Sequence, residues 1–272
     1  MPAYAPIHGI ARDVTPLDTL LASPMLVPIV GVLIVAALAH GALGFGFPVI
    51  STPVIAMMTD IQTAILVTLF PNLAVNLISI FRGGNLRASL AVHWPMPVYV
   101  AVGTIIGTRT LLVIADPEPL KLLLAAMIVV FLQQARFRRL DWSWLQRHPQ
   151  ASGLAFGLLA GFLSGTVNVA VPPLVIYFMG LGLDALPMTQ ILNLCFFVGR
   201  GMQAVTFGIS GTIGMATLLA TAPLTLLSLA VLALGMRIQS RIEPAVYQRL
   251  LRQVLWVMAA LLVVQVVRHY LH

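Results

Sequence analysis

Residues 24–59 read PMLVPIVGVLIVAALAHGALGFGFPVISTPVIAMMT and contain no Asp, Glu, Lys or Arg. A helix that spans a bilayer needs about 20 apolar residues, so this stretch is too long for one straight crossing. Its interruption is residues 41–48, GALGFGFP, where three glycines precede a proline. We predict a helix, a break, and a second helix of about 12 residues, which at about 1.5 Å per residue is shorter than a bilayer core.

The same arrangement occurs again in residues 149–183, which are also uncharged and carry the interruption GFLSGTVN at 161–168. Further runs without a charged residue lie at 61–81, 88–108, 122–135 and 253–267, and the stretch 185–236 contains only Arg200. Turns are predicted at Gly83-Gly84-Asn85, Asp116-Pro117, Gly208 to Gly214 and Glu243-Pro244.

Composition places the chain in lipid. Of the 272 residues 60% are hydrophobic and 8% charged, against about 25% charged in a soluble domain. The basic balance of 15 Lys+Arg over 8 Asp+Glu does not indicate nucleic-acid binding, because Arg136, Arg138, Arg139 and Arg147 gather between two apolar halves, as in a cytoplasmic loop. Cys195, the single cysteine, excludes an intramolecular disulfide. Residues 1–23 do not have the pattern of a cleavable signal peptide.

Internal repetition organises the chain. Gly46 and Pro53 match Gly165 and Pro172 at an offset of 119 residues, and the Gly-x-Arg motif at Gly107 matches that at Gly235. We predict an all-α polytopic membrane protein of two homologous repeats, each a broken helix pair plus three long transmembrane helices, with about 8–10 membrane segments. The predicted parts are an N-terminal tail (1–23), repeat 1 (24–135), a basic cytoplasmic linker (136–150) and repeat 2 (151–272).

Positive charge favours inverted over parallel repeats. If each broken pair makes no net crossing, the repeats invert, and ten Lys or Arg residues lie inside against four outside. If each pair crosses once, the tally is eight against six. The positive-inside rule prefers the first arrangement, which is also a recurring transporter plan.

The two breaks are the first candidates for chemistry. An unwound backbone in lipid exposes polar groups and survives only when it is buried in protein or lines a polar cavity. The N-terminus of each short helix offers free N–H groups and a positive dipole end, which together suit an anion. Pro48 suits a first helical position and Asn168 an N-cap. The alternative is that the glycines only allow close helix packing.

Arg200 is the one charged side chain expected far from a helix end, and its partners are backbone carbonyls, water or an anionic ligand. A structural role and a ligand-binding role both remain open. Candidate solute-binding residues lie at the breaks or on the helices that follow them: Gly44, Gly46, Ser51, Thr52, Asn72, Asn76, Ser164, Gly165, Thr166, Asn168, Asn193, Arg200 and Gln203.

Other polar residues are assigned structural roles. Asp60 and Asp184 precede long helices and are expected to cap them. His40 and His93 have no second ligand at metal spacing, so neither a metal site nor a cofactor is expected. The apolar segments contain no Asp or Glu, which argues against a cation substrate and against carboxylate-based proton coupling.

The repeated pattern of glycine break, downstream proline, Gly-x-Arg end and acid-proline turn resembles the sulfite exporter TauE/SafE family over roughly residues 28–268. The residues that carry the resemblance are Gly41, Gly44, Gly46, Pro53, Gly107, Arg109, Gly161, Gly165, Pro172, Gly235 and Arg237. The resemblance implies a permease for sulfite, sulfonates or related organic anions. Phe45 and Phe47 alternate with the glycines here, which favours a bulkier or less polar anion than sulfite.

We therefore expect a multi-pass transporter or exporter of a small anion in the cell membrane, whose partners are that solute and the lipid bilayer, with a homo-oligomer left open. The solute would bind at the paired breaks with alternating access. Two alternatives are an intramembrane serine hydrolase at Ser164, which lacks the usual glycine spacing and a downstream histidine, and a non-transporting scaffold.

Overall fold

The computed structural model describes residues 24–82, 86–114, 116, 118–133, 136, 142–238, 253, 256, 259–264 and 266–268. Several predicted features lie outside these residues: the tail 1–23, the Gly83–Asn85 turn, Pro117, the Glu243-Pro244 turn, and Arg138 and Arg139 of the linker.

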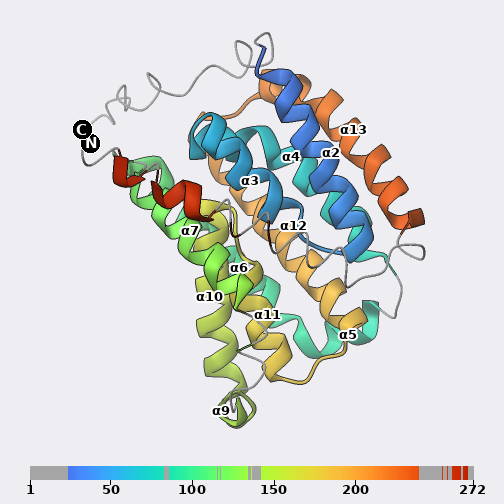
Figure 1. Ribbon diagram of the computed structural model, residues 1–272. Coiled ribbons are helices and arrows are strands. Elements are labelled where there is room, and N and C mark those ends of the chain that lie inside the picture. The colour runs from blue at the N-terminus through green and yellow to red at the C-terminus, as the bar shows by residue number, and fades with distance from the viewer. Residues whose placement is uncertain are drawn as a thin grey trace, which may run out of the picture.

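The described residues form helices joined by short connections, without a strand among them (Figure 1). The helices of the first half are α2 (Leu26–Leu43), α3 (Phe47–Met58), α4 (Ile61–Ile80), α5 (Leu86–His93), α6 (Pro95–Val113) and α7 (Glu118–Leu132). After the linker helix α9 (Ser143–Arg147), the second half contains α10 (Pro149–Val167), α11 (Val171–Gly180), α12 (Ala185–Ile209) and α13 (Met215–Ile238).

Six of these helices, α2, α4, α6, α10, α12 and α13, are long and apolar enough to cross a membrane. The prediction of an all-helical multi-pass membrane protein is thereby confirmed, whereas the count of 8–10 segments stays a prediction. α3, α11 and a segment at 259–268 are shorter apolar helices. α7 has 15 residues, about 22 Å of helix, so it is not a third long helix in the first half.

Both predicted breaks exist, but both are shorter than expected and begin later, the first at Gly44 and the second at Asn168. α2 ends at Gly44 (φ +87°), and α3 starts after Gly46 (φ +117°), two left-handed conformations that suit glycine. α10 continues as a helix through 161–167 and ends at Asn168 (φ +61°). The prediction that residues 161–167 are unwound is therefore wrong, because Gly161 and Gly165 serve helix packing instead.

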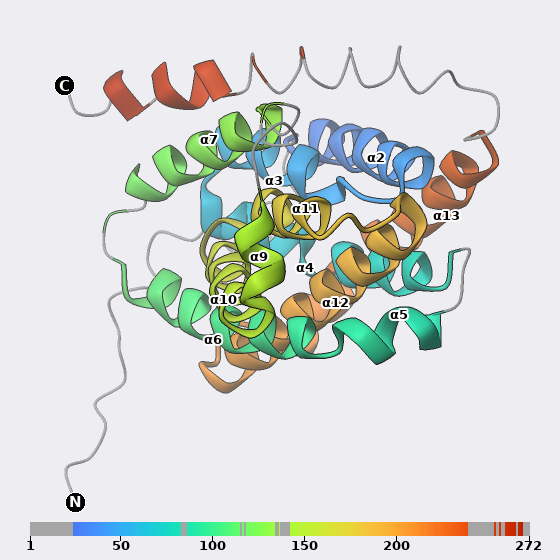
Figure 2. The same ribbon diagram turned by 90° about the horizontal axis from the view of Figure 1, so that it is seen from below.

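These glycines lie in two close helix seams. α10 packs along α6, and α2 packs along α13, as Figures 1 and 2 show from two sides. A Cβ on Gly165 would lie 2.5 Å from the carbonyl oxygen of Thr104, and a Cβ on Gly41 would lie 2.5 Å from that of Leu232. Small residues let these backbones approach, which was the alternative reading of the glycine pattern.

The packing is reciprocal between the two halves. The first helix of each half packs on a long helix of the other, and the contacts of α12 with α6 have a counterpart in those of α4 with α13. Each short helix also packs against the helix that precedes it, α3 on α2 and α11 on α10. α4 and α12 meet at the centre between the halves.

Four pairs of similarly placed residues in the two halves are 124 residues apart, whereas the predicted match of Gly46 and Pro53 with Gly165 and Pro172 uses 119. The pairs are Gly41 and Gly165 in the seams, Gly44 and Asn168 at the helix ends, Pro48 and Pro172 in the first turns of the short helices, and Asp60 and Asp184 before the long helices. Pro53 lies in the middle of α3 and Pro172 at the start of α11, so the predicted pairing of these two prolines is wrong.

Candidate functional site

The first break is held by His40, one turn before it. The backbone N–H of Gly44 donates to the His40 carbonyl (2.7 Å), and the N–H of Phe47 donates to His40 Nδ1 (3.3 Å). The other ring nitrogen, Nε2, lies 3.0 Å from Ser79 Oγ on α4. Since Nδ1 accepts a hydrogen bond, Nε2 carries the proton of a neutral ring. His40 is thus a structural residue of the break, as expected.

The second break is held by the side chain of Asn168, which reaches across to the first half. Its Nδ2 donates to Thr52 Oγ1 on α3 (2.6 Å) and to Thr68 Oγ1 on α4 (3.2 Å), while Asn72 Nδ2 donates to its Oδ1 (3.4 Å). Asn168 is the C-cap of α10, and Ala170 precedes α11, so its prediction as an N-cap is wrong. Its amide acts on the neighbouring helices instead.

Few backbone N–H groups remain for an anion at either short helix. In α3 the N–H of Phe47 is bonded to His40, Pro48 has none, and that of Val49 donates to the Gly46 carbonyl (3.1 Å). In α11 the second and third residues are Pro172 and Pro173, which have no N–H. The dipole ends are present, but side chains must supply most of the donors.

Arg200 supplies the charge. Its side chain is 2% exposed on α12 and lies against the α10 segment before the break. Nη2 donates to the carbonyl oxygen (2.5 Å) and to the Oγ (2.6 Å) of Ser164, and Nη1 donates to Gln203 Oε1. Gln203 Nε2 in turn donates to the Gly165 carbonyl (2.9 Å). Each of these partners is neutral, so they solvate the guanidinium without cancelling its charge.

A fully buried hydroxyl without a hydrogen-bond partner adjoins this cluster. Thr104 on α6 is 0% exposed, and its Oγ1 has no partner within the part of the chain that the structure describes. A Cβ added to Gly199 would lie 3.2 Å from both Thr104 Oγ1 and Ser164 Oγ. Gly199 therefore lies close against both hydroxyls, beside Arg200, with little room even for a methyl group. We call Thr104, Ser164, Gly199, Arg200 and Gln203 the arginine cluster.

The other predicted site residues divide into two groups. Asn76 and Asn193 join the polar contacts at the breaks, because Asn76 Nδ2 donates to Asn72 Oδ1 (2.7 Å) and Asn193 Nδ2 donates to the Gly44 carbonyl (2.7 Å). Ser51 and Thr166 bond instead to carbonyls one turn back in their own helices. Gly46 supplies the left-handed turn, with open space where a Cβ would lie.

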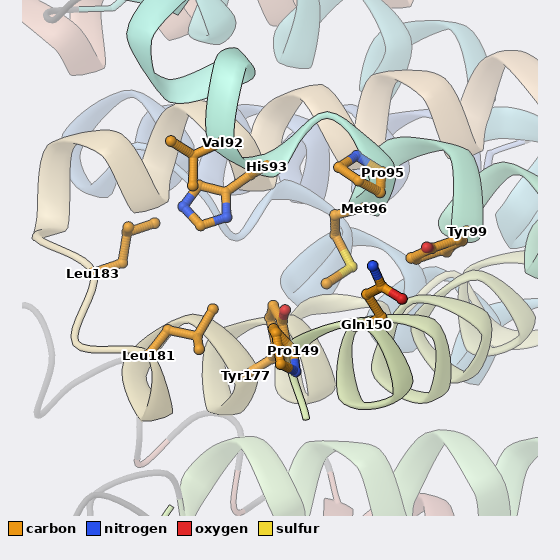
Figure 3. Close-up of a pocket in the computed structure, with 11 residues that line it drawn as sticks. Val92, His93, Pro95, Met96, Tyr99, Pro149, Gln150, Tyr177, Leu181 and Leu183 are labelled. Atoms are coloured by element: carbon orange, nitrogen blue, oxygen red, sulfur yellow. The ribbon is translucent and has the colours of Figure 1, made fainter. Parts of the chain in front are cut away.

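The breaks and the arginine cluster are closed to both sides in this conformation. The side chains of Thr52, Asn72, Asn168, Ser164 and Arg200 are at most 2% exposed. A separate cavity of about 490 Å³ lies between α5, α6, α10 and α11, where α6 and α10 begin (Figure 3). It is lined by Val92, His93, Pro95, Met96, Tyr99, Pro149, Gln150, Gly153, Tyr177, Leu181 and Leu183.

Comparison with known families shows which class of protein this chain is. The family model for the sulfite exporter TauE/SafE matches residues 29–262. The chain belongs to this family. No curated protein matches the chain, and no solved structure does. Together with the six apolar helices, the family makes this chain a multi-pass TauE/SafE permease of the cell membrane, a transporter of the sulfite-exporter type.

The TauE/SafE resemblance rests on residues that build the scaffold. Gly41 and Gly235 meet in the α2–α13 seam, and Gly107 and Gly165 in the α6–α10 seam. The sequence interpretation missed Thr68 and Thr104, and it gave Ser79 no role. The 124-residue register would have pointed to Ser79, because it aligns with Gln203 just as His40 aligns with Ser164.

Proposed function

We propose that this TauE/SafE protein carries a small sulfite- or sulfonate-like anion, and that the arginine cluster binds its charged group. The single observation that carries the proposal is Arg200, buried to 2% exposure among neutral partners. The ion pair between Lys121 and Glu118 is far from Arg200 in the chain, and no carboxylate is among the hydrogen-bond partners of Arg200. A buried cation without a counterion is unfavourable by about 2.5–3.5 kcal/mol on insertion scales, and a bound anion offsets that cost.

The arginine cluster also provides the geometry for such an anion. Thr104 Oγ1 and Ser164 Oγ both lie next to Gly199, and these two hydroxyls can donate to oxyanion oxygens once the halves move apart and make room. The guanidinium of Arg200 is bonded to the same Ser164 Oγ. Charge-assisted hydrogen bonds of this kind contribute about 1.5–3 kcal/mol each.

Alternating access is supported by the two-half architecture. Reciprocal packing and the separation of 124 residues between four pairs of features agree with two inverted repeats, in which the hairpins α2–α3 and α10–α11 each make no net crossing of the membrane. Hydrogen bonds of Asn168 to Thr52 and Thr68, and of Asn193 to Gly44, join one half to the other. Rocking of the halves would break these bonds in turn and open the arginine cluster to either side. We propose that the linker side is cytoplasmic.

The alternatives are not favoured by the contacts. Ser164 Oγ is bonded to the guanidinium of Arg200, a group that donates hydrogen bonds and does not take a proton from serine. A non-transporting scaffold would have no use for the buried charge of Arg200.

The test is counterflow of labelled sulfite in proteoliposomes. Arg200→Met should lower flux at least tenfold, because it removes the charge and the hydrogen bonds, while Arg200→Lys should retain part of it. Arg268→Met, at an exposed arginine of the C-terminal helix, is the matched control and should transport normally. Flux of the Arg200→Met variant at the wild-type level would refute the assigned role.

A further inference from the structure

The cavity between α5, α6, α10 and α11 is separate from the arginine cluster. It touches α10 at Gly153, whereas the cluster touches α10 at Ser164, eleven residues or about 16 Å further along the helix. Because the cluster is closed, a solute in this conformation can occupy the cavity without reaching Arg200. The cavity is therefore a second place for a ligand, at the end of the molecule where α6 and α10 begin.

The cavity walls are mostly apolar. Val92, Met96, Leu181 and Leu183 face the space, with Pro95 and Pro149 at the helix starts. About 490 Å³ lies in the range of pockets for organic molecules, and a sulfite ion would fill only a small part of it. Gly153 keeps the floor open, because a Cβ there would lie 3.1 Å from Tyr177 Oη. The size and walls fit the apolar body of an organic molecule.

The polar groups of the cavity favour a negative charge. His93 and Gln150 project into the space from opposite sides in Figure 3, and both can donate hydrogen bonds. No acidic residue is among those that line the cavity. The dipoles of α6 and α10, which begin at the cavity, and of α5 and α11, which end at it, offset one another, so the side-chain donors decide the preference. The imidazole of His93 is fixed edge-on against Phe178, with ring centroids 5.5 Å apart.

We propose that this cavity binds organic anions with an alkyl or aryl body, the charged group at His93 and Gln150 and the body against Met96 and Leu183. The proposal rests on the proposed function for the sign of the charge. It adds a separate site that captures the apolar body of such an anion before the anion reaches the arginine cluster.

The test uses a series of alkanesulfonates, from methanesulfonate to hexanesulfonate, titrated calorimetrically into the purified protein. Affinity should rise about fourfold for each added methylene until the body fills the cavity. Hexanol should bind at least tenfold more weakly than hexanesulfonate, because it lacks the charge. Equal affinity for methanesulfonate and hexanesulfonate would overturn the proposal, and equal affinity for hexanol would indicate a lipid-like site and overturn it as well.

A matched pair of substitutions localises the effect. Val92→Trp fills the cavity from an exposed position (71%) and should abolish the chain-length dependence, whereas Val113→Trp, at an equally exposed position (75%) away from the cavity, should leave it intact. Gln150→Leu is a second variant at an exposed residue and should weaken every anion of the series. A chain-length dependence that persists in Val92→Trp would refute the assigned place.

The outcomes separate the two proposals. If sulfite flux depends on Arg200 but affinity does not depend on chain length, only the cavity proposal fails. If affinity depends on chain length and Val92→Trp abolishes that dependence, while Arg200→Met transports normally, only the proposal for the arginine cluster fails.

Discussion

Two glycines on one turn of α12 allow an effect on the proposed anion site to be told apart from an effect on helix stability. Gly199 and Gly201 both lie in α12, two residues apart. A Cβ on Gly199 would lie 3.2 Å from Ser164 Oγ and Thr104 Oγ1, while a Cβ on Gly201 would meet nothing within 4 Å. The change of each glycine to alanine adds the same methyl group, so the pair isolates the effect of crowding beside Arg200.

The expected energies follow from these contacts. Replacing glycine by alanine inside a helix stabilises it by about 0.5–1 kcal/mol. Gly201→Ala should show this gain in full. In Gly199→Ala the gain is offset, because Ser164 Oγ is held at 2.6 Å by Arg200 and cannot retreat without lengthening that bond. We expect Gly199→Ala to unfold near the wild-type temperature and Gly201→Ala a few degrees above it.

Transport rates should differ more between the two variants than their unfolding temperatures do. In Gly199→Ala the methyl group crowds the two hydroxyls that bind the proposed anion, so sulfite counterflow in proteoliposomes should fall at least tenfold. Gly201→Ala should transport like the wild type. Thermal unfolding in detergent verifies that both variants are folded. If folded Gly199→Ala carries sulfite at the wild-type rate, the anion does not bind between Thr104 and Ser164, and the reasoning fails.

Two further predictions concern a helix cap and the pH dependence of the cavity. Asp60 accepts from both the N–H (2.9 Å) and the Oγ1 (2.5 Å) of Thr63, so Asp60→Ala should destabilise the protein by about 1 kcal/mol in thermal unfolding, whereas Asp184→Ala should have a smaller effect because Asp184 makes no such cap bond. Burial lowers the pKa of His93, so its ring is neutral at pH 7 and becomes charged only below its ordinary value of about 6.5. Hexanesulfonate affinity should therefore be flat from pH 8 to 7 and rise only below pH 6.5, a rise that His93→Gln should remove. The titratable groups that face His93 across the cavity are Tyr99 of α6 and Tyr177 of α11, Gln150 of α10 has no charge, and Arg87 lies on the same helix as His93.

Much of the helical architecture was predictable, because long apolar runs without charge can only be satisfied by helices in lipid. The end of α10, at the second break, was not predictable from composition. Gly161 and Gly165 suggested an unwound segment, yet both are helical. Glycine is needed at these positions because α6 packs too closely to leave room for a side chain. Glycine serves both purposes, and only the partner helix decides between them.

The arginine cluster was predictable only in part, because a linear pattern does not show which helices pack against each other. Arg200, Ser164 and Gln203 stood out as polar residues in apolar runs, and they do meet. Thr104 did not stand out, because threonine in a membrane helix usually bonds to its own backbone, as Thr68 does to the Ala64 carbonyl (2.7 Å). Its importance comes from the missing side chain of Gly199 on another helix, which a linear pattern does not reveal.

An alignment of residues that are 124 positions apart also suggests why the centre of the molecule has one buried arginine, Arg200, and not two. His40 aligns with Ser164, Ser79 with Gln203, and Asn76 with Arg200. In each half the residue before the break bonds to the following long helix, His40 to Ser79 and Ser164 to Arg200, while Gln203 bonds to the Gly165 carbonyl. The first half keeps this contact neutral, whereas the second half carries a charge. A second arginine at position 76 would place two buried cations on facing helices, since α4 packs against α12, and would require two anions for neutrality. If the proposed anion binds at Arg200, a single anion neutralises the centre, and its release would restore the charge that favours the next anion.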